Sequence, residues 1–393
     1  MSLARRQIAI AILGVLVAAA CLRPAITSFG PVLDRIAADT GLSAGVLGVL
    51  GSLPLVMFGL VSPLVHRMAA RLGTERLLAS ALGILAVGTA LRSVPGNLLL
   101  WLGTVLIGGA IAVGNVLVPS IVKRDFGKRM PLMTSLYTAV MGGMAAFASG
   151  LAVPIADATG TWRWALGAWF VLALAGCAIW ALRPNQDDVD AHAEVAGSTT
   201  VWRVPTAWYV SLNMGFQSSV FYMTITWLPT YETDHGYTAA TAGWHLFAYQ
   251  VTGMLCGFAI AIPLDRSRNQ SVLAAAVGVW MVGAVLGMLF APDAMWLWAV
   301  LGGMSSGSSL VVALSLIGMR ARTHSSTVRL SGMAQSVGYL IAAGATVGAG
   351  AIVEASSSRG LLVAMAIIAA IQTIFGALAG RDVYVDDAVA ARA

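Results

Sequence analysis

Charged residues are scarce in this sequence. They make up 10% of the 393 residues, whereas hydrophobic residues make up 58%, and soluble domains carry about 25% charged residues. Such a chain lacks the polar surface of a water-soluble protein, and its composition excludes a disordered chain or a coiled coil. Its three cysteines, Cys21, Cys177 and Cys256, lie in apolar stretches. We therefore expect buried thiols rather than disulfides or metal ligands, and an all-α polytopic membrane protein.

Long apolar runs predict the number of membrane-spanning helices. A spanning helix needs about 20 apolar residues, and the sequence offers twelve such runs. We expect helices at 8–33, 43–66, 77–94, 98–122, 130–156, 162–182, 204–231, 240–263, 271–291, 294–319, 328–353 and 359–379.

The basic residues predict the orientation in the membrane. Eighteen of the 23 Lys and Arg residues fall on one side of the predicted helices and four on the other. Cytoplasmic loops carry the excess of Lys and Arg, so we expect both termini in the cytoplasm of a bacterium, with the chain in its inner membrane. The net charge of +6 is then explained by orientation in the membrane, and we expect no nucleic-acid partner.

A polar stretch at 183–203 divides the predicted helices into six and six. We expect an N-terminal bundle at 1–182, a cytoplasmic linker at 183–203 and a C-terminal bundle at 204–393, with a short cytoplasmic tail that frays from Gly380. Asp39-Thr-Gly41 and Asp234-His-Gly236 repeat at an offset of 195 residues. Parallel repeats of six helices are typical of the major facilitator fold.

Several short motifs carry a resemblance to a known family. They are Leu22-Arg23-Pro24, Asn115-Val-Leu-Val-Pro119, Lys123-Arg124-Asp125-Phe126, Gln217-Ser218-Ser219-Val-Phe221-Tyr222, Trp227-Leu-Pro229 and Ser331-Gly332-Met-Ala-Gln335-Ser-Val-Gly338-Tyr339. With them the chain resembles the cyanate transporter and 2-nitroimidazole transporter branch of the major facilitator superfamily. The resemblance implies two six-helix bundles and secondary transport of a small molecule by alternating access. We expect a monomer whose partners are this substrate, the lipid bilayer and, if transport is ion-coupled, protons.

The resembled superfamily also carries a conserved gating loop between its second and third helices, with a weaker copy in the second half. Here the copies are His66 to Arg76 and Asp265-Arg266, and Ala70 stands where the family has an acid. The resemblance implies that charged residues of these two loops lock the halves together, and the cytoplasmic charge cluster at Lys123, Arg124 and Asp125 is a further candidate for closing a gate. These candidates are Arg71, Lys123, Arg124, Asp125, Asp265 and Arg266; the alternative is that the basic ones only set topology.

Arg23 is the sharpest candidate for substrate binding. It lies about 15 residues, roughly 22 Å, into the first predicted helix, where a charge costs at least about 2.5–3.5 kcal/mol. An anion in a cavity would offset that cost, and a structural partner is the alternative. Pro24 cannot donate a backbone hydrogen bond, so we expect a local break in the helix there.

Other polar and aromatic residues within the predicted spans are candidates for the same pocket, against the alternative of hydrogen bonds between helices. In the 195-residue repeat Ser218 corresponds to Arg23, and pairs four residues apart share a helix face. The full set of substrate-binding candidates is Arg23, Thr27, Asn115, Tyr137, Gln217, Ser218, Tyr222, Trp227, Gln335 and Tyr339.

Proton coupling has no obvious carrier, because no Asp or Glu lies in the middle of a predicted span. His245 is the one histidine within a span, near its periplasmic end, and Glu354 lies at a helix end on that side. Both are candidates for proton coupling, with a hydrogen-bonded structural histidine as the alternative for His245.

These observations favour secondary transport over other functions. The first hypothesis is a transporter of a small polar, anionic solute such as cyanate, with Arg23 supplying the charge. The second is export of a small neutral heteroaromatic such as a 2-nitroimidazole, stacked on Tyr137, Phe216, Tyr222 and Trp227. A receptor that binds without transport would need an output domain, and an intramembrane enzyme would need a catalytic constellation. The sequence leaves the direction of transport and the coupling ion open.

Overall fold

The computed structural model describes residues 3–126, 130–183, 201–267, 269–322, 324–355 and 358–390. The first half contains α1 (Leu3–Cys21), α2 (Pro24–Thr27), η1 (Gly30–Val32), α3 (Leu33–Thr40), α4 (Ala44–Leu72), α5 (Thr74–Ser93), α6 (Asn97–Phe126), α7 (Met130–Thr159), α8 (Trp162–Gly167) and α9 (Phe170–Ala181). The second half contains η4 (Val201–Arg203), α10 (Pro205–Asp234), α11 (Ala239–Arg266), α12 (Ser271–Phe290), η5 (Pro292–Ala294), α13 (Met295–Met319), α14 (His324–Ala355), α15 (Ser358–Ala379) and α16 (Val385–Ala390).

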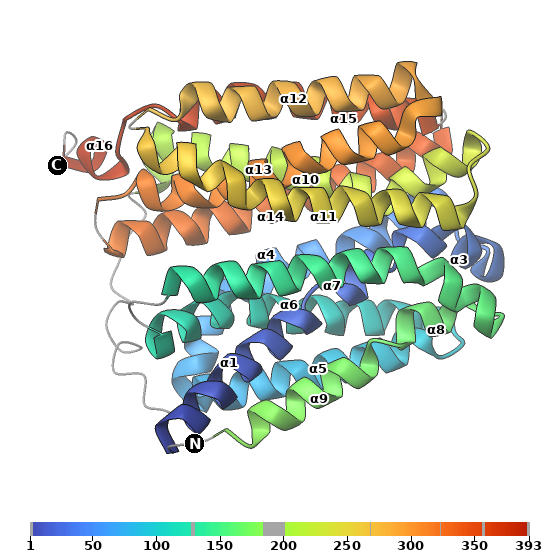
Figure 1. Cartoon of the computed structure of the whole chain (residues 1–393), viewed down its shortest axis with the longest axis horizontal. Helices are drawn as coiled ribbons and strands as arrows, with labels where there is room; N and C mark the ends of the chain where they lie inside the picture. The colour runs from blue at the N-terminus through green and yellow to red at the C-terminus, as the bar shows by residue number, and fades with distance from the viewer. Residues whose placement is uncertain are drawn as a thin grey trace.

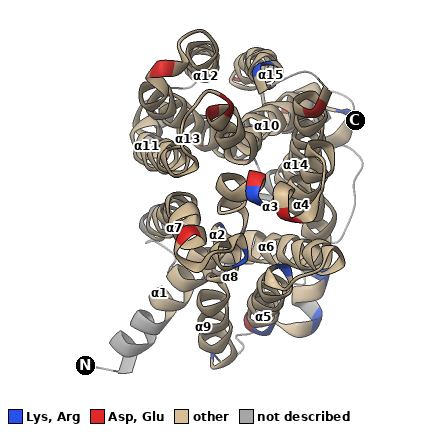
Figure 2. Ribbon diagram, turned by 90° about the vertical axis from the view of Figure 1, so that its right-hand side faces the viewer, with Lys and Arg blue, Asp and Glu red and all other residues tan. Residues whose placement is uncertain are grey.

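The helices form two bundles whose long axes run in the same direction (Figure 1). Each predicted span corresponds to one helical pass, with the first pass broken into α1, α2, η1 and α3 and the sixth into α8 and α9. Seen along the helices, the bundles meet where α4 packs on α14 and α7 packs on α11 (Figure 2). The prediction of an all-α protein with two six-helix bundles is confirmed. Most of the predicted linker, 184–200, lies outside the described residues.

Eleven helical passes among the described residues are long and apolar enough to span a membrane. The twelfth, α10, has the length but carries buried polar side chains along its middle, among them Asn213, Gln217 and Thr224. It packs against α13, α14 and α15, so protein rather than lipid surrounds these groups. Polar residues within spans face bundle interiors or cavities because exposure to lipid is costly. The polarity of α10 therefore marks it as a helix of the protein interior.

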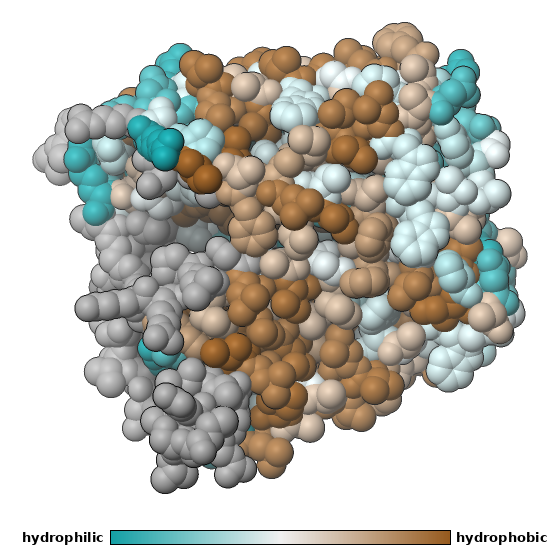
Figure 3. All heavy atoms as spheres, in the orientation of Figure 1, coloured by the Kyte–Doolittle hydropathy of each residue, from teal (hydrophilic) through white to brown (hydrophobic). Residues whose placement is uncertain are grey.

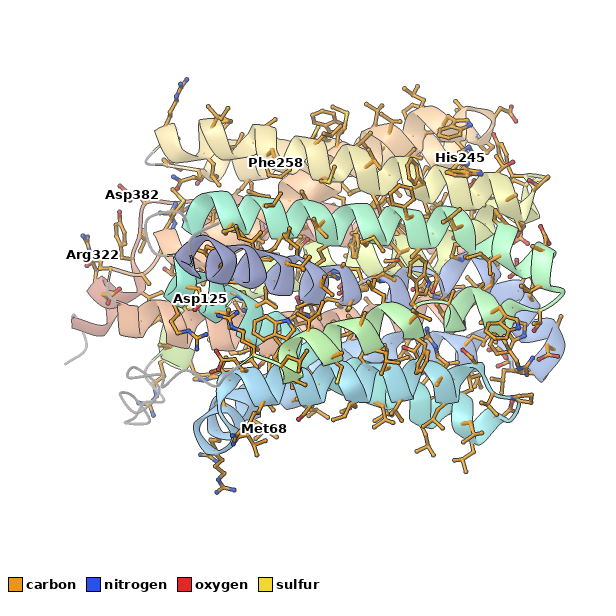
Figure 4. The ribbon with its side chains drawn as sticks, turned by 60° about the horizontal axis from the view of Figure 1, so that its bottom comes forward. Met68, Asp125, His245, Phe258, Arg322 and Asp382 are labelled. Atoms are coloured by element: carbon orange, nitrogen blue, oxygen red, sulfur yellow. The ribbon has the colours of Figure 1, made fainter. Side chains whose placement is uncertain are left out.

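The two ends of the molecule differ in charge. Helix directions place Arg71, Arg124 and Arg322 at the same end, which we call the basic end, and the end where α3, α8 and the start of α11 lie is the opposite end. Figure 4 shows Asp125, Arg322 and Asp382 at the basic end and His245 at the opposite end. On the face shown in Figure 3, hydrophobic residues dominate the surface between the two ends. This pattern matches a bilayer-spanning protein with polar residues at both water interfaces.

The C-terminal tail is anchored, which corrects the expectation that it frays from Gly380. Arg320 is 1% exposed and donates from Nε to the Ala379 carbonyl oxygen and from Nη2 to that of Gly380, both at 2.8 Å. Burial lowers the pKa of Arg320, while the nearby Asp382 acts in the opposite direction. Val385 N donates to the Arg320 carbonyl oxygen at 2.9 Å. A buried arginine thus pairs with the free carbonyl groups at the end of α15.

Glycines allow α11 and α13 to pack with their backbones in contact. A Cβ on Gly307 would overlap the carbonyl oxygen of Gly253, and a Cβ on Gly303 would overlap that of Tyr249. Small residues at such positions drive helix association in membranes by allowing close van der Waals packing. This contact holds the second bundle together beside the surface that faces α7.

Candidate functional site

The first helical pass breaks at Arg23, as Pro24 predicts. The α1 helix ends at Cys21 and α2 begins at Pro24, where the missing N–H costs no hydrogen bond because the first turn of a helix leaves it free. The carbonyl oxygen of Arg23 accepts from Ile26 N at 2.9 Å and from Thr27 N at 3.0 Å. The break interrupts the regular helix and places Arg23 at the junction of two helical segments.

The side chain of Arg23 reaches across to the second bundle. Its Nη1 donates to the hydroxyl of Tyr222 on α10 at 2.9 Å, and its guanidinium lies 5.9 Å from the ring centre of Phe221. Tyr339 of α14 lies within electrostatic range of both Arg23 and Tyr222 and packs edge-on against Phe58 of α4, with ring centres 5.2 Å apart. We call Arg23, Tyr222 and Tyr339 the central cluster.

The charge of Arg23 has no counter-charge in this arrangement. The side chains that interact with it are phenols, and no carboxylate among the described residues forms an ion pair with it. A guanidinium held within a membrane protein without an acid is unfavourable. The central cluster can therefore accept an anion, because it offers a cationic group and two hydroxyls, with the ring of Phe221 beside them.

Side-chain exposure differs along the central cluster. Arg23, Asn115, Gln335 and Tyr339 are half-buried. Trp227, which lies toward the opposite end of α10, is buried at 1% exposure.

Some predicted residues lie on helices that contribute to the central cluster or that pack against the helix break. Gln335 is one turn from Tyr339 on α14 and donates to Ser331 Oγ at 2.9 Å. Gln217 on α10 is buried and donates to Ser218 Oγ at 2.8 Å. The amide of Gln217 and the hydroxyl of Ser218 therefore already share a hydrogen bond. Asn115 of α6 follows Gly114, where a Cβ would overlap Leu22 at the helix break.

Other predicted residues are buried in packing contacts of their own. Thr27 is fully buried and donates to the Ala145 carbonyl oxygen at 3.0 Å, which ties α2 to α7. Trp227 lies against Gly48 and Gly350, between α4 and α14. Tyr137 is 9% exposed and lies in the hydrophobic core cluster that also contains Tyr222 of the second bundle. Phe216, expected to stack on a ligand, instead stacks on Phe375, with ring centres 5.7 Å apart.

The bundles are packed closely at the opposite end. The carboxylate of Glu354, at the end of α14, accepts from Gly45 N at 2.7 Å and from Ser43 Oγ at 3.2 Å, which caps the first turn of α4 across the bundle interface. Asp34 of α3 accepts from Thr230 and Thr233 of α10, both at 3.2 Å. These contacts close the side of the central cluster that faces the opposite end.

Removal of the Glu354 cap should loosen the start of α4. In Glu354→Ala, Gly45 N loses its acceptor, so we expect amide hydrogen exchange across 43–47 to rise about threefold, equivalent to less than 1 kcal/mol. Asp293→Ala at the same end is the control, because Asp293 is exposed and lies outside this contact. Equal exchange in the wild type and in Glu354→Ala would contradict a role in closure.

Two of the predicted gating residues pair within the first bundle. Arg124 contacts Glu75 at 2.5 Å and Asp125 at 2.8 Å, and Asp125 also pairs with Arg183 beyond α9. Arg71 and Arg266 end their helices with exposed side chains. The side chains of Lys123 and Asp265 lie outside the described residues. The charges of Arg124 and Asp125 thus join α5, α6 and the end of α9.

His245 and Glu232 form a buried pair near the opposite end. His245 Nδ1 contacts Glu232 Oε2, and both side chains are 0% exposed. The rings of Tyr237 and Trp296 pack edge-on against the imidazole, with ring centres 5.4 and 4.7 Å away. The sequence interpretation placed Glu232 just beyond a span and overlooked it. The short connection between α10 and α11 was the available signal, because it brings residues before and after it together.

Arg92 is a buried arginine that the sequence did not single out. It was expected at the end of a predicted helix, on the face away from the cytoplasm, and it lies near the end of α5 with 2% of its surface exposed. Its Nη2 donates to the carbonyl oxygen of Ala25, within α2, at 2.6 Å. No local pattern in the sequence distinguishes it from an interfacial arginine.

Among the described residues, no group of three or more His, Cys, Asp or Glu side chains could hold a metal ion.

Comparison with known proteins identifies the family. The model of the Major Facilitator Superfamily matches residues 15–343. The chain belongs to this superfamily. It is 38% identical to the transporter YycB of Bacillus subtilis (strain 168) over 381 residues, covering 95% of this chain and 94% of that protein.

Two Escherichia coli (strain K12) relatives confirm the branch that the motifs indicated. The chain is 36% identical to a 2-nitroimidazole transporter over 387 residues, covering 97% of this chain and 98% of that protein. It is 25% identical to the cyanate transport protein CynX over 327 residues, covering 82% of this chain and 84% of CynX. This member of the superfamily is therefore a membrane transporter.

Solved structures support the fold. A bacterial homologue of the human lysosomal transporter Spinster, described as inward-facing and occupied, superposes with a TM-score of 0.79 at 14% identity. The match covers 96% of this chain and 97% of that one. At this identity the likeness shows the fold alone.

Proposed function

We propose that this superfamily member is a secondary transporter of a small anionic solute of the cyanate type, which it moves by alternating access. The observation that carries this proposal is the guanidinium of Arg23. It lies at a helix break between the two bundles, is half-buried, and has no carboxylate partner among the described residues. In transporters built from repeats, the substrate site lies at the interface between the repeats, which is where Arg23 lies.

The central cluster suggests how binding is coupled to movement. Arg23 belongs to the first bundle and Tyr222 and Tyr339 to the second, so an anion bound by all three would contact both bundles. A ligand shifts a conformational equilibrium only by its difference in affinity for the two states. An anion that replaces the Tyr222 hydroxyl as the Arg23 partner supplies such a difference. Gln217, Ser218, Asn115 and Gln335 would contribute hydrogen bonds from the surrounding wall.

A neutral heteroaromatic such as a 2-nitroimidazole is the second candidate substrate. The rings of Phe221 and Tyr222 lie beside Arg23, and Phe58 packs on Tyr339. Offset or edge-on ring contacts stabilise bound aromatics. The 36% identity to a protein named as a 2-nitroimidazole transporter favours the same reading. The two candidates differ in whether binding requires the charge of Arg23.

Uptake into proteoliposomes tests the proposal directly. We expect the purified protein to carry radiolabelled cyanate or 2-nitroimidazole across the bilayer with saturation kinetics, at rates well above those of protein-free vesicles. An imposed pH gradient shows whether protons drive accumulation. Binding to the purified protein without transport of either compound would contradict this function and favour a receptor.

If protons are coupled to transport, the His245–Glu232 pair and Glu354 are the candidates to carry them. His245 and Glu232 are buried together, and Glu354 sits at the contact between bundles. We expect His245→Gln combined with Glu354→Gln to reduce accumulation driven by a pH gradient at least tenfold while counterflow without a gradient persists. Full pH-driven accumulation in this double variant would remove both residues from the coupling mechanism.

The orientation follows from the charge distribution. We propose that the basic end faces the cytoplasm of a bacterial inner membrane, which places both termini there. We expect a cysteine added at either terminus to react with an impermeant maleimide in inverted vesicles and to be protected in intact spheroplasts. Labelling of both termini in spheroplasts would contradict this topology.

We further propose a monomer, since each chain contains a complete central cluster.

A further inference from the structure

Gln250 of α11 belongs to the second bundle, and its amide reaches into the first. Its Nε2 donates to Ser149 Oγ of α7 at 2.7 Å and lies 3.2 Å from the carbonyl oxygen of Ala145, one turn away on α7. Its contact with the Leu246 carbonyl oxygen of its own helix is longer, at 3.3 Å. Gln250 is 7% exposed and Ser149 is fully buried, so these hydrogen bonds join the bundles within the protein interior.

The same two groups of α7 hold the short helix that follows Arg23. Ser149 Oγ donates to the carbonyl oxygen of Thr27 at 3.1 Å, the shorter of the two contacts in which it is the donor. Thr27 Oγ1 donates to the Ala145 carbonyl oxygen at 3.0 Å, and Thr27 N donates to that of Arg23 at 3.0 Å. A continuous chain of hydrogen bonds thus runs from Gln250 of the second bundle to the backbone of Arg23. We call Gln250, Ser149 and Thr27 the bridge.

The bridge depends on close contact between α7 and α11, which face each other where the bundles meet (Figure 2). A Cβ on Gly243 of α11 would lie 3.0 Å from the Ser149 carbonyl oxygen. The Oε1 of Gln250 is buried without a hydrogen-bond partner among the described residues, which is unfavourable. Separation of α7 from α11 would break the bridge, and the unpaired oxygen lowers the free energy that this separation costs.

We propose that Gln250 is a positioning residue for Arg23, and that it makes the helix break at Arg23 sensitive to contact between α7 and α11. While these helices touch, the bridge fixes α2 and the junction from which the Arg23 side chain extends to Tyr222. When they separate, Ser149 loses its donor and the second bundle no longer holds α2. The anion affinity of Arg23 then differs between the two states, as alternating access requires. This last step rests on the proposed function, whereas the bridge itself does not.

Loss of the Gln250 amide should loosen α2 and favour separation of the bundles. Gln250→Met removes the amide at similar volume. We expect exchange of the amides at 26–28, which donate to the Arg23 and Pro24 carbonyl oxygens, to rise about fivefold, as for loss of one hydrogen bond. Spin labels at Ala158→Cys and Ala291→Cys, exposed at the opposite end of the two bundles, report separation in a background without native cysteines. The ratio of longer to shorter distances should rise about fivefold.

Gln372→Met is the matched control. Gln372 is also buried, has an unpaired Oε1 among the described residues and donates to a serine hydroxyl at 2.9 Å, but its partner Ser309 lies in the same bundle. We expect a lower unfolding temperature in this variant, with wild-type exchange at 26–28 and wild-type spin-label distances. A merely structural role for Gln250 would give the same result in Gln250→Met.

A double-mutant cycle with Ser149→Ala shows whether the bridge acts as a unit. Ser149→Ala breaks the bridge from the first bundle, so Gln250→Met should add little to its effect on exchange at 26–28. Ser149→Ala also decides the question by itself should Gln250→Met not fold. Cyanate binding to either variant should weaken about fivefold.

Wild-type exchange and distances in Gln250→Met, additive effects in the cycle, or wild-type cyanate affinity in Gln250→Met would overturn the proposal. If the wild type did not bind cyanate while exchange and distances changed as expected, the proposed function would fail and the bridge would stand.

Discussion

Arg23→Gln should weaken binding of an anionic substrate at least tenfold, which corresponds to at least about 1.4 kcal/mol. Two unit charges 4 Å apart at an effective dielectric of 20 attract by about 4 kcal/mol, and desolvation of the anion offsets part of this. Glutamine keeps hydrogen-bond donors and removes the charge. Arg23→Lys should restore only part of the affinity, because an ammonium cannot make a planar two-pronged contact. Equilibrium binding of cyanate to purified variants measures the effect.

Arg35→Gln is the matched control for loss of a positive charge. Arg35 pairs with Asp157 at 2.7 Å near the opposite end, and its side chain is 37% exposed. We expect wild-type affinity in this variant.

For a neutral heteroaromatic substrate, Arg23→Gln should be nearly tolerated, while Tyr222→Ala should weaken binding more through loss of ring contacts. Wild-type cyanate affinity in Arg23→Gln would leave Arg23 as a structural residue.

The second large effect concerns Gly307. In Gly307→Ala the new methyl group would overlap the Gly253 carbonyl oxygen, so α11 and α13 would have to separate. Overpacking of this kind costs typically about 1–3 kcal/mol, and more where backbone must move. We expect a fall of about 5 °C or more in unfolding temperature and a loss of monodisperse protein in detergent, measured by size-exclusion chromatography and thermal unfolding.

Gly283→Ala is the control for this prediction. Gly283 lies on α12, and a Cβ there has no neighbour within 4 Å, so the same substitution adds a methyl group without a clash. We expect an unfolding temperature within about 1 °C of the wild type, since alanine is also the better helix former. Equal stability of the two variants would show that α11 and α13 can separate without cost.

Part of the candidate site could be predicted from the sequence, and part could not. The break at Pro24 and the importance of Arg23 were predictable, because proline removes a backbone donor and a charge within a span needs a partner. The side chains that contact Arg23 were not predictable. Tyr222 and Tyr339 come close to Arg23 only when the two bundles meet. Trp227 shares the polar helix α10 with Tyr222, yet it packs between Gly48 and Gly350. Helical periodicity predicts which residues share a helix face, but not which helix packs against that face.

The sequence by itself determined that this chain crosses a membrane, how many helical passes it makes and where its basic residues gather. These properties depend on apolar run length and on charge in the loops, which are local quantities. Only the tertiary structure decided which polar groups compensate one another. It buried Arg92 beside Ala25, paired His245 with Glu232 and anchored the tail on Arg320. Each of these contacts joins different helices, so it depends on packing that no single segment encodes.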